Sequence, residues 1–351
     1  MLVTGVSLLK GTSQVSDKCT RLTPAQKINS PVAIVSEDLA AIKGAVLQTT
    51  ETQEIWSQQN ALVAPNSAWG GWVFEAKFLP EPGQGRILLS AQQELHGLLL
   101  IRNGWKTSHQ LRLVFLLEFQ QVAIARADQL YDYYDFSVLD PQEDRALEFT
   151  LPVLAQGFHQ MAILLITDPE SLSTDSEYRM MQQHSFSEQR FDLWADAALG
   201  ASGVPVFETA ELGQAAASRF ADIELAASPL AQENALLDSL TLEPGQEHCL
   251  YLHLFNKKSE VNAPYAGPVP LRIALFWDDR LGQVLDYDLL ADAPDNVVLP
   301  LLAQAPTQAG SHQFEVVVFS FPRWSQFNSV GQRTGFPFAA YSRRVLVEVQ
   351  P

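Results

Sequence analysis

Basic residues are scarce in this sequence. Lys and Arg together number 23 against 40 Asp and Glu, which gives a formal net charge of −17. Such a chain repels the phosphates of nucleic acids and of anionic lipids. Long apolar runs are missing as well, because the longest have only the length of a strand and a membrane helix needs about 18 residues. We therefore expect no nucleic acid as a partner and no membrane insertion.

Cysteine is equally scarce. Cys19 and Cys249 are the only two, and 230 positions separate them. Cys19 also precedes both domains inferred below, so the sequence excludes a disulfide framework and leaves the redox compartment open. Residues 1–10 lack a charged start and a long apolar core, so no signal peptide is visible, and any export signal has been removed or never existed.

An internal repeat is what the chain does contain. At about 100–200 residues per domain, 351 residues predict two domains. Five short segments recur in the same order 148 to 162 residues later. The pairs are 81–84 with 243–246, 111–113 with 271–273, 151–156 with 299–304, 157–160 with 310–313, and 186–187 with 341–342. Anchors that keep their order predict a duplicated domain.

Both copies have the pattern of β-strands. In 250–255 leucine occupies every second position, so Leu250, Leu252 and Leu254 share one face and we expect them to point into a core. Tyr251 and His253 then face outward or toward a sheet edge. Turn residues follow every 10–15 positions, and only 208–220 carries a weak helical period. The sequence predicts an all-β protein of tandem sandwiches.

The layout of each copy resembles a known group. A Pro-Gly turn precedes an alternating strand that ends in Asn, and Leu-Pro and Gly-x-His precede a later β-branched strand. This order is similar to bacterial immunoglobulin-like modules of the CARDB and fibronectin type III-like kind, over 66–196 and 205–351. The resemblance implies two immunoglobulin-like sandwich domains, a linker at 197–204, and a non-catalytic adhesive or spacer role outside the cell. The segment 197–227 is long for a linker plus a first strand.

Residues 1–65 lie outside the repeat. The run 30–35 has the composition of a strand, and 38–50 that of a short helix or a second strand. Their flanks are rich in Thr, Gln and Ser, as linkers are. We expect a partly ordered segment that is either linker-like or made of accessory strands.

Metal ligands are present without a metal-binding pattern. His248 and His253 point to opposite faces of a strand, so they cannot bind one ion together with Cys249. His159 and His312 follow glycine at equivalent positions, which indicates a ring bonded to a loop carbonyl. We expect no cofactor and no metal. One acidic loop is a weak calcium candidate although it lacks the EF-hand spacing, and its residues are Asp168, Glu170, Asp175 and Glu177.

Carboxylates beside aromatic residues are the candidates for catalysis. They are Asp278 and Asp279 next to Trp277, then Asp286 and Asp288, and in the first copy Asp132 and Asp135. A glycosidase needs two carboxylates about 5–10 Å apart in a cleft, which spacing in sequence does not establish. We expect no catalytic residues and no enzyme.

The segment 322–340 has no Asp or Glu in a strongly acidic chain. Its aromatic and basic residues are Arg323, Trp324, Phe327, Arg333, Phe336 and Phe338. Exposed aromatics with arginine are typical of binding hot spots. In an immunoglobulin-like sandwich, however, this loop lies at the end that faces the preceding domain. It therefore packs against the first domain, binds an external ligand, or folds over its own core.

These patterns favour a non-catalytic structural or adhesive protein of a bacterial surface or extracellular assembly. Its partners would be a protein or glycan at a surface, or further copies of itself. The alternative is a carbohydrate-binding protein that stacks sugars on Trp324 or Trp277. An enzyme of unrecognised type is the third hypothesis.

Overall fold

The computed structural model describes residues 19–37, 68–74, 86–89, 94–173, 187–196, 222–229, 237–255, 268–290, 292–294, 296–325 and 339–351. Within these ranges every element of regular secondary structure is a β-strand, which confirms the prediction of an all-β protein. In this described part, no helix is long and apolar enough to cross a membrane.

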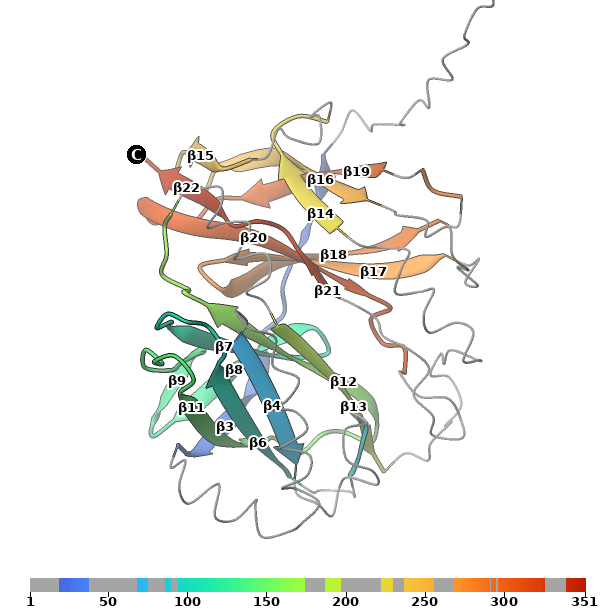
Figure 1. Ribbon diagram of the computed structural model, residues 1–351. Helices are drawn as coiled ribbons and strands as arrows, with labels where there is room; N and C mark the ends of the chain where they lie inside the picture. The colour runs from blue at the N-terminus through green and yellow to red at the C-terminus, as the bar shows by residue number, and fades with distance from the viewer. Residues whose placement is uncertain are drawn as a thin grey trace, which may run out of the picture.

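The strands form four layers stacked on one another (Figure 1). The two lower layers make up sandwich I. Its outer sheet has the order β4 (Ala68–Phe74), β6 (Leu95–Asn103), β11 (Asp144–Leu151), β3 (Ile28–Ser36) and β8 (Gln120–Arg126), with β9 (Gln129–Tyr131) beside β8. Its inner sheet has the order β8, β7 (Leu111–Leu117), β12 (Gly157–Thr167), β13 (Ser187–Ala195) and β5 (Arg86–Leu89), with β10 (Tyr134–Asp135) beside β7. Strand β8 thus pairs in both sheets.

The two upper layers make up sandwich II. Its inner sheet has the order β15 (Ser239–Leu242), β22 (Val345–Val349), β20 (Gly310–Ser320), β17 (Val269–Trp277), β18 (Arg280–Leu289) and β2 (Thr23–Pro24), with β21 (Ala339–Tyr341) beside β20. Its outer sheet has the order β1 (Thr20–Arg21), β19 (Asn296–Gln304), β16 (Glu247–Phe255) and β14 (Asp222–Ala226).

The strand orders of the two sandwiches correspond. The outer sheets contain β4-β6-β11 and β14-β16-β19, and the inner sheets contain β5-β13-β12-β7-β8 and β15-β22-β20-β17-β18. In each inner sheet the first of these strands runs parallel to the second, and the other pairs are antiparallel. Two packed, mainly antiparallel sheets of this kind make an immunoglobulin-like β-sandwich. Leu111 in β7 and Leu271 in β17 occupy corresponding strands.

Each sandwich encloses a core of side chains from its two sheets. Leu250, Leu252 and Leu254 of β16 are at most 2% exposed and belong to the core of sandwich II, as predicted. Tyr251 is half-buried. His253 points away from the leucines but is only 3% exposed, and the amide of Asn296 lies 3.3 Å from its Nδ1. The predicted face is right, but His253 does not reach solvent.

A third core lies between the two inner sheets. It joins apolar residues of sandwich I to apolar residues of sandwich II. They are Val114, Leu116, Phe119, Ala162, Leu164 and Ile166 below, and Ala274, Phe276, Val284, Val317 and Phe319 above. The inner sheets are therefore buried on both faces, which is why β7 is apolar almost throughout and buried at every residue. The expected placing of one domain at the end of the other is wrong, because the sandwiches pack face to face.

The N-terminal segment crosses all four layers (Figure 1). Strand β1 pairs with β19 and β2 pairs with β18, both in sandwich II. Strand β3 then inserts between β11 and β8 in sandwich I. Accessory strands, and not a linker, therefore describe residues 19–37, and the expected strand at 30–35 lies within β3. The remaining positions of 1–65 fall outside the described residues.

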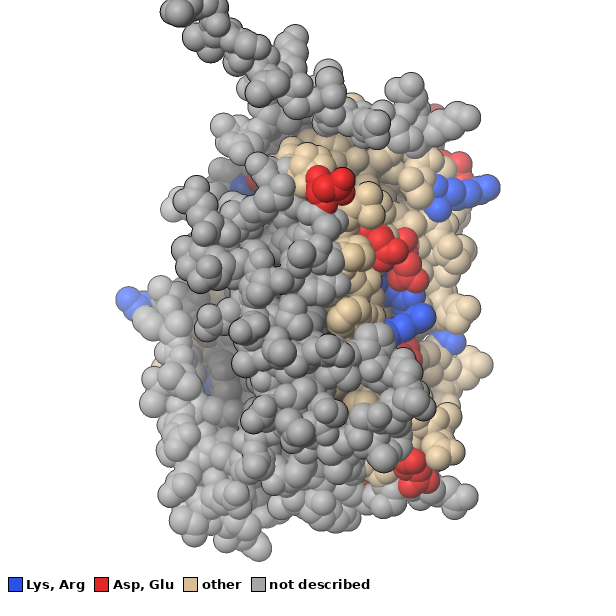
Figure 2. Space-filling view, turned by 90° about the vertical axis from the view of Figure 1, so that its right-hand side faces the viewer, with Lys and Arg blue, Asp and Glu red and all other residues tan. Residues whose placement is uncertain are grey.

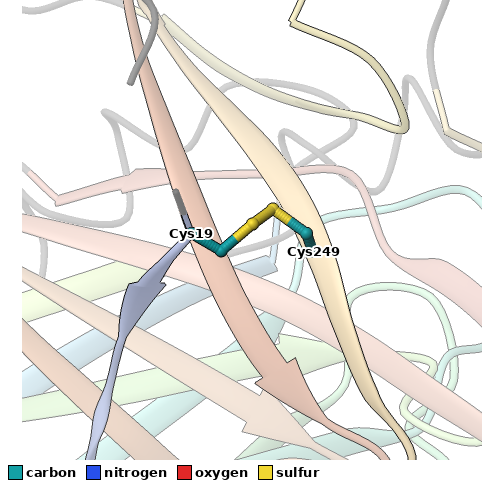
Figure 3. The surroundings of a disulfide bond; sticks show 2 residues. All are labelled: Cys19 and Cys249. Atoms are coloured by element: carbon teal, nitrogen blue, oxygen red, sulfur yellow. A yellow bond between two sulfur atoms is a disulfide. The ribbon is translucent and has the colours of Figure 1, made fainter. Parts of the chain in front are cut away.

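A disulfide joins Cys19 to Cys249, with their Cα atoms 5.9 Å apart (Figure 3). The prediction from the sequence that the two cysteines form no disulfide is therefore wrong. The two cysteines are 230 residues apart in sequence but close in space, because β1 belongs to the outer sheet that contains β16. The bond fastens the N-terminal segment to sandwich II.

Truncating Leu252 tests the core of sandwich II. We expect Leu252→Ala to lower the free energy of unfolding by about 2–5 kcal/mol, because it leaves a cavity at a fully buried position. Leu130→Ala is the matched control, since Leu130 is 66% exposed, and it should cost less than about 0.5 kcal/mol. Urea titration measures both. Equal costs for the two variants would contradict the assignment.

Candidate functional site

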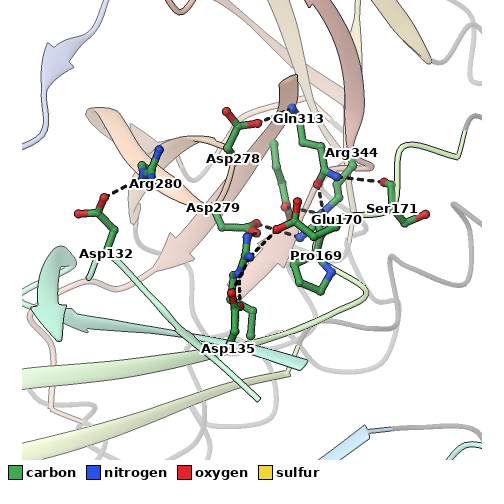
Figure 4. A network of polar contacts seen from close by, with 12 residues as sticks. Asp132, Asp135, Pro169, Glu170, Ser171, Asp278, Asp279, Arg280, Gln313 and Arg344 are labelled. Carbon is green, nitrogen blue, oxygen red and sulfur yellow. Dashed lines mark hydrogen bonds and ion pairs between the residues drawn. The ribbon is translucent and has the colours of Figure 1, made fainter. Parts of the chain in front are cut away.

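Charged side chains are buried together between the two inner sheets. Arg112 comes from β7, Asp279 from the turn between β17 and β18, and Arg344 from the residue before β22. Each is at most 5% exposed. Figure 4 shows Asp279 and Arg344 of sandwich II beside Asp135, Pro169 and Glu170 of sandwich I. This charged network is the candidate site.

Asp279 connects the two sandwiches. Its Oδ2 accepts a hydrogen bond of 2.8 Å from Arg112, and its Oδ1 accepts one of 2.9 Å from Arg344. Asp278 and Asp279 both have positive φ, 49° and 61°, and form a two-residue hairpin turn. Aspartate tolerates this left-handed backbone better than most residues. The tight turn places the Asp279 carboxylate between the two guanidinium groups.

Arg112 has two further partners. Its Nε lies 2.6 Å from Asp135 and its Nη2 lies 2.5 Å from Glu170. Burial alone would lower the pKa of Arg112, but the hydrogen bonds that it donates to Asp135 and Asp279, together with their charges, outweigh burial and raise the pKa. The Tyr133 ring also lies 3.6 Å from the Arg112 guanidinium carbon. Arg112 stays charged and serves to hold the sandwiches together.

Glu315 of β20 is the most unusual acid of the network. It is 4% exposed, and its Oε2 lies 3.4 Å from Nε of Arg344. Its Oε1 has no hydrogen-bond partner among the described residues. Burial raises the pKa of Glu315 to about 8, although the nearby Arg344 opposes the shift. Burial therefore favours the protonated form of Glu315.

Two histidines hold the hairpin turns at the interface. His159 Nδ1 lies 3.0 Å from the Glu118 carboxylate and His312 Nδ1 lies 2.7 Å from that of Asp278. The Nε2 atoms face the carbonyls of residues 155 and 308, at 2.8 and 2.9 Å. This confirms the predicted bond to a loop carbonyl. The Glu118 hydrogen bond raises the pKa of His159. For His312, burial lowers the pKa but the bond to Asp278 outweighs it.

The residue after each histidine reaches across the interface. Gln160 donates from Nε2 to the carbonyl of Trp324 at 2.6 Å, and its Oε1 accepts from the backbone N–H of Arg323 at 2.8 Å. Gln313 donates from Nε2 to the carbonyl of Ser171 at 3.0 Å. Ser171 lies four residues beyond the end of β12, which carries Gln160, and Trp324 lies four residues beyond the end of β20, which carries Gln313. The two glutamines thus make the same contact in opposite directions.

The arginines repeat this exchange. Arg112 reaches the β17–β18 turn, and Arg272 reaches the β7–β8 turn, where it donates to the carbonyl of Glu118 at 3.1 Å. Arg190 donates to the carbonyl of Ser320 at 2.9 Å, and Arg344 donates to that of Pro169 at 3.1 Å. Contacts that recur when the partners are exchanged are the mark of a two-fold interface.

The two halves of the interface differ in charge. At the positions of Asp279 and Glu315, sandwich I carries Phe119 and Ala162. The Arg190 guanidinium carbon lies 4.9 Å from the centre of the Phe119 ring, so an aromatic face replaces the carboxylate there. In one half of the interface two arginines share the carboxylate of Asp279, and in the other Arg190 lies over the ring of Phe119.

Of the segment 322–340, the structure describes residues 322–325 and 339–340. The Trp324 ring packs on Phe321 and on the core of sandwich II. The backbone beside it contacts sandwich I through Gln160, and the Ser325 hydroxyl donates to Asp192 at 2.8 Å. Arg323 contributes its backbone N–H. The other named residues, Phe327, Arg333, Phe336 and Phe338, lie outside the described residues.

The calcium candidates that are described have protein partners. Asp168 lies 2.7 Å from Nδ1 of His109, and Glu170 pairs with Arg112. Asp175 and Glu177 fall outside the described residues. Within the part of the chain that the structure describes, no group of three His, Cys, Asp or Glu could hold a metal ion.

Most of the catalytic candidates are likewise engaged. Asp132 pairs with Arg280 and Asp286 pairs with Arg272, whose hydrogen bond lowers the pKa of Asp286. The Trp277 ring packs on Phe314 at 4.6 Å between centroids. These carboxylates act as acceptors for protein cations.

A cavity of about 440 Å³ opens at one end of sandwich I. Tyr134 and Phe136 lie at its apolar side, and Arg126, Arg145 and Glu37 are among its charged residues. Arg126 pairs with Glu37 at 2.9 Å, and Arg145 pairs with Glu143. The charged groups of this cavity thus have partners within the protein.

A scan against protein-family models found no match, and a comparison with curated proteins found none either. Among solved structures, a CARDB domain from Pyrococcus furiosus in complex with di-metal ions is 11% identical, with a TM-score of 0.24, over 37% of this chain and 87% of that one. The C-terminal domain of a Streptococcus agalactiae AgI/II polypeptide is 7% identical, with a TM-score of 0.21, over 80% of this chain and 100% of that one. A human PapD-like domain is 11% identical, with a TM-score of 0.21, over 38% and 88%. Likenesses at such TM-scores carry no argument about this chain.

Sequence reasoning missed the buried arginines and glutamines. Arg112 and Arg272 were seen as parts of a repeated Leu-Arg-Leu or Leu-Arg-Ile segment, and Gln160 and Gln313 as parts of a repeated turn. A cation at the same place in two otherwise apolar strands was the available signal, because a buried arginine requires a partner.

Removing the charge of Asp279 tests the ionic network. We expect Asp279→Asn to lower the free energy of unfolding by about 3–5 kcal/mol, because Arg112 and Arg344 lose their shared counter-charge in a buried place. Asp132→Asn breaks the exposed pair with Arg280 across the same interface and should cost less than about 1 kcal/mol. Chemical denaturation measures both. Equal small losses would contradict a structural role for Asp279.

Glu315 predicts a pH dependence of stability. The folded protein holds the Glu315 proton up to about pH 8, whereas the unfolded chain releases it near the ordinary pKa of 4.5. The contribution of Glu315 to stability is therefore fully present below the unfolded pKa and is lost as the pH rises toward 8. We expect Glu315→Gln, which keeps an uncharged side chain, to gain stability relative to the unmodified protein between pH 6 and 9. Urea unfolding across this range measures the difference.

The matched control is Glu247→Gln, at an exposed pair with Arg21. It should follow the unmodified protein at every pH. His159 and His312 titrate alike in all three proteins, so the difference isolates Glu315. Parallel stability curves for Glu315→Gln and the unmodified protein would show that Glu315 is ionised in the folded state.

Proposed function

We propose that the chain is a non-catalytic structural or adhesive component of a bacterial surface or extracellular assembly. The observation that carries this proposal is the interface between the sandwiches. A continuous apolar core, a buried ionic network and paired glutamine contacts fix two sandwiches as one block. Interfaces between domains of one chain are usually more polar and allow motion. A fixed block suits a part that transmits load or presents a surface.

The disulfide supports a location outside the cytoplasm. Disulfides persist in oxidising compartments and are rare where thiols are kept reduced. The Cys19–Cys249 bond holds the N-terminal segment on sandwich II, so its loss would release the accessory strands from one end. An extracellular or cell-surface location follows for the proposed function.

The absence of catalysis belongs to the same proposal. The described carboxylates among the catalytic candidates are mostly bound to arginine, histidine or backbone N–H groups, which leaves them poorly placed to move protons on a substrate. A general acid or base needs access to its substrate.

An internal duplication also forms part of the proposal. Shared strand order and contacts that recur on exchange of the sandwiches support it. A duplicated module that pairs with itself reproduces within one chain the isologous interface of a homodimer. The CARDB or fibronectin type III-like kind is the module that we propose on the sequence layout.

Protein or glycan surfaces, or further copies of the chain, are the proposed partners. On the face in Figure 2, acidic and basic side chains of the described part lie beside each other. Such mixed charge suits a specific contact and does not favour binding to a polyanion.

Cell-surface location and the state of the thiols test this function together. We expect protease added to intact producing cells to remove the protein, and a maleimide reagent to label Cys19 and Cys249 only after reduction. A protein that is protected from protease and has two free thiols would overturn the proposal. Binding of the purified chain to a glycan array would favour the carbohydrate-binding alternative.

A further inference from the structure

Both sandwiches take up a strand from outside their repeated sequence beside corresponding strands of their outer sheets. In sandwich I the outer sheet follows β4-β6-β11, and in sandwich II it follows β14-β16-β19. Among the described residues, the next strand is β3 beside β11 and β1 beside β19. Both added strands come from the single N-terminal segment 19–37. One donor segment thus adds a strand to each outer sheet, at the edge beside β19 in sandwich II and between β11 and β8 in sandwich I.

The donor segment pairs through its backbone with little regard to direction. Strand β1 runs parallel to β19, whereas β3 runs antiparallel to β11. Main-chain hydrogen bonds of this kind provide affinity in strand addition, and buried side chains provide specificity. The two positions therefore accept the same segment in opposite orientations relative to their neighbouring strands.

Three side chains anchor the donor segment, one in each core. Leu22 is 4% exposed in the core of sandwich II, and Val32 is fully buried in that of sandwich I. Ala25 packs on the core between the sandwiches, and its N–H donates to the carbonyl of Gly282 at 3.0 Å. The order of the three anchors in the sequence matches the order in which the three cores are stacked. This match makes the segment specific for these edges.

Charge favours the same occupant. Residues 19–37 contain Arg21, Lys27 and Glu37, whereas the whole chain has a net charge of −17. Arg21 pairs with Glu247 of β16 at 3.1 Å. A slightly basic segment is therefore attracted to an acidic acceptor, whether that acceptor is its own chain or another copy.

The length of chain beyond the donor permits exchange between copies. Thirty residues, 38–67, separate Glu37 from the start of β4. Fully extended, such a stretch spans up to about 100 Å. A folded chain of this length is about 50 Å across by the usual scaling of the radius of gyration. The segment can therefore reach the acceptor edges of a neighbouring copy.

We propose that the positions beside β11 and β19 are strand-acceptor sites and that copies of this chain join by exchanging residues 19–37. The exchanged segment makes on the neighbour the contacts that it makes on its own chain. Oxidation of Cys19 of one copy and Cys249 of the other then fixes the exchange, with loss of two protons and two electrons to a disulfide oxidant of the extracytoplasmic compartment. This assembly rests on the proposed structural function.

Isotope mixing of the full chain tests the exchange. Light and ¹⁵N-labelled protein are mixed, reduced, incubated at several concentrations, oxidised with glutathione disulfide and digested. We expect cross-linked Cys19–Cys249 peptides with one light and one heavy partner, in a proportion that rises with protein concentration. Same-isotope pairs alone at every concentration would overturn the proposal. So would Cys19–Cys19 and Cys249–Cys249 pairs in equal abundance, because they mark random pairing of unfolded chains.

A variant of the donor adds a directional readout. Heavy protein that carries Leu22→Ser has a weakened anchor but unchanged acceptor edges. Mixed with light unmodified protein, it should yield mixed pairs in which Cys19 comes mainly from the light chain. Equal contributions from the two chains would show that cross-linking does not report strand docking, and would overturn the proposal. Either failure leaves the surface location testable by itself, since that test needs no exchange.

Discussion

The contact between the two inner sheets joins two hydrophobic cores through a third. Because it buries both faces of β7, β12, β17 and β20, polar groups on these strands must find partners inside the protein. Arg112 and Arg344 donate hydrogen bonds to Asp279. Gln160 and Gln313 donate hydrogen bonds to backbone carbonyls of the other sandwich. Burial provides the driving force, and the polar contacts fix the relative position of the sheets.

The two halves of this interface compensate their buried arginines in different ways. An interface with two-fold character repeats each environment, and a buried arginine on each side needs compensation. One side provides the carboxylate of Asp279, and the other provides the ring of Phe119 under Arg190. Both a carboxylate and an aromatic ring stabilise a buried guanidinium group, so the two inner sheets pack together although the residues at corresponding positions differ.

Residues 19–37 give the chain a second kind of connection. They complete sheets in both sandwiches and are held at one end by Cys19. The interface fixes sheet against sheet, while this segment links outer and inner layers along their edges. A sheet edge without such cover exposes unpaired N–H and C=O groups, which favours association. Residues 19–37 therefore use the same backbone hydrogen bonds whether they pair with their own chain or, as proposed, with a neighbouring copy.

The sequence by itself determined the strands and their buried faces, because alternation in 250–255 and the repeated turns follow from the period of a β-strand. It also marked, without explaining, Arg112, Gln160 and their counterparts. Only the tertiary structure decided which faces meet, that Asp279 lies between two arginines, and that Cys19 lies beside Cys249. The reason is physical, since local pattern sets which way a side chain points, whereas its partner across an interface depends on how whole sheets pack.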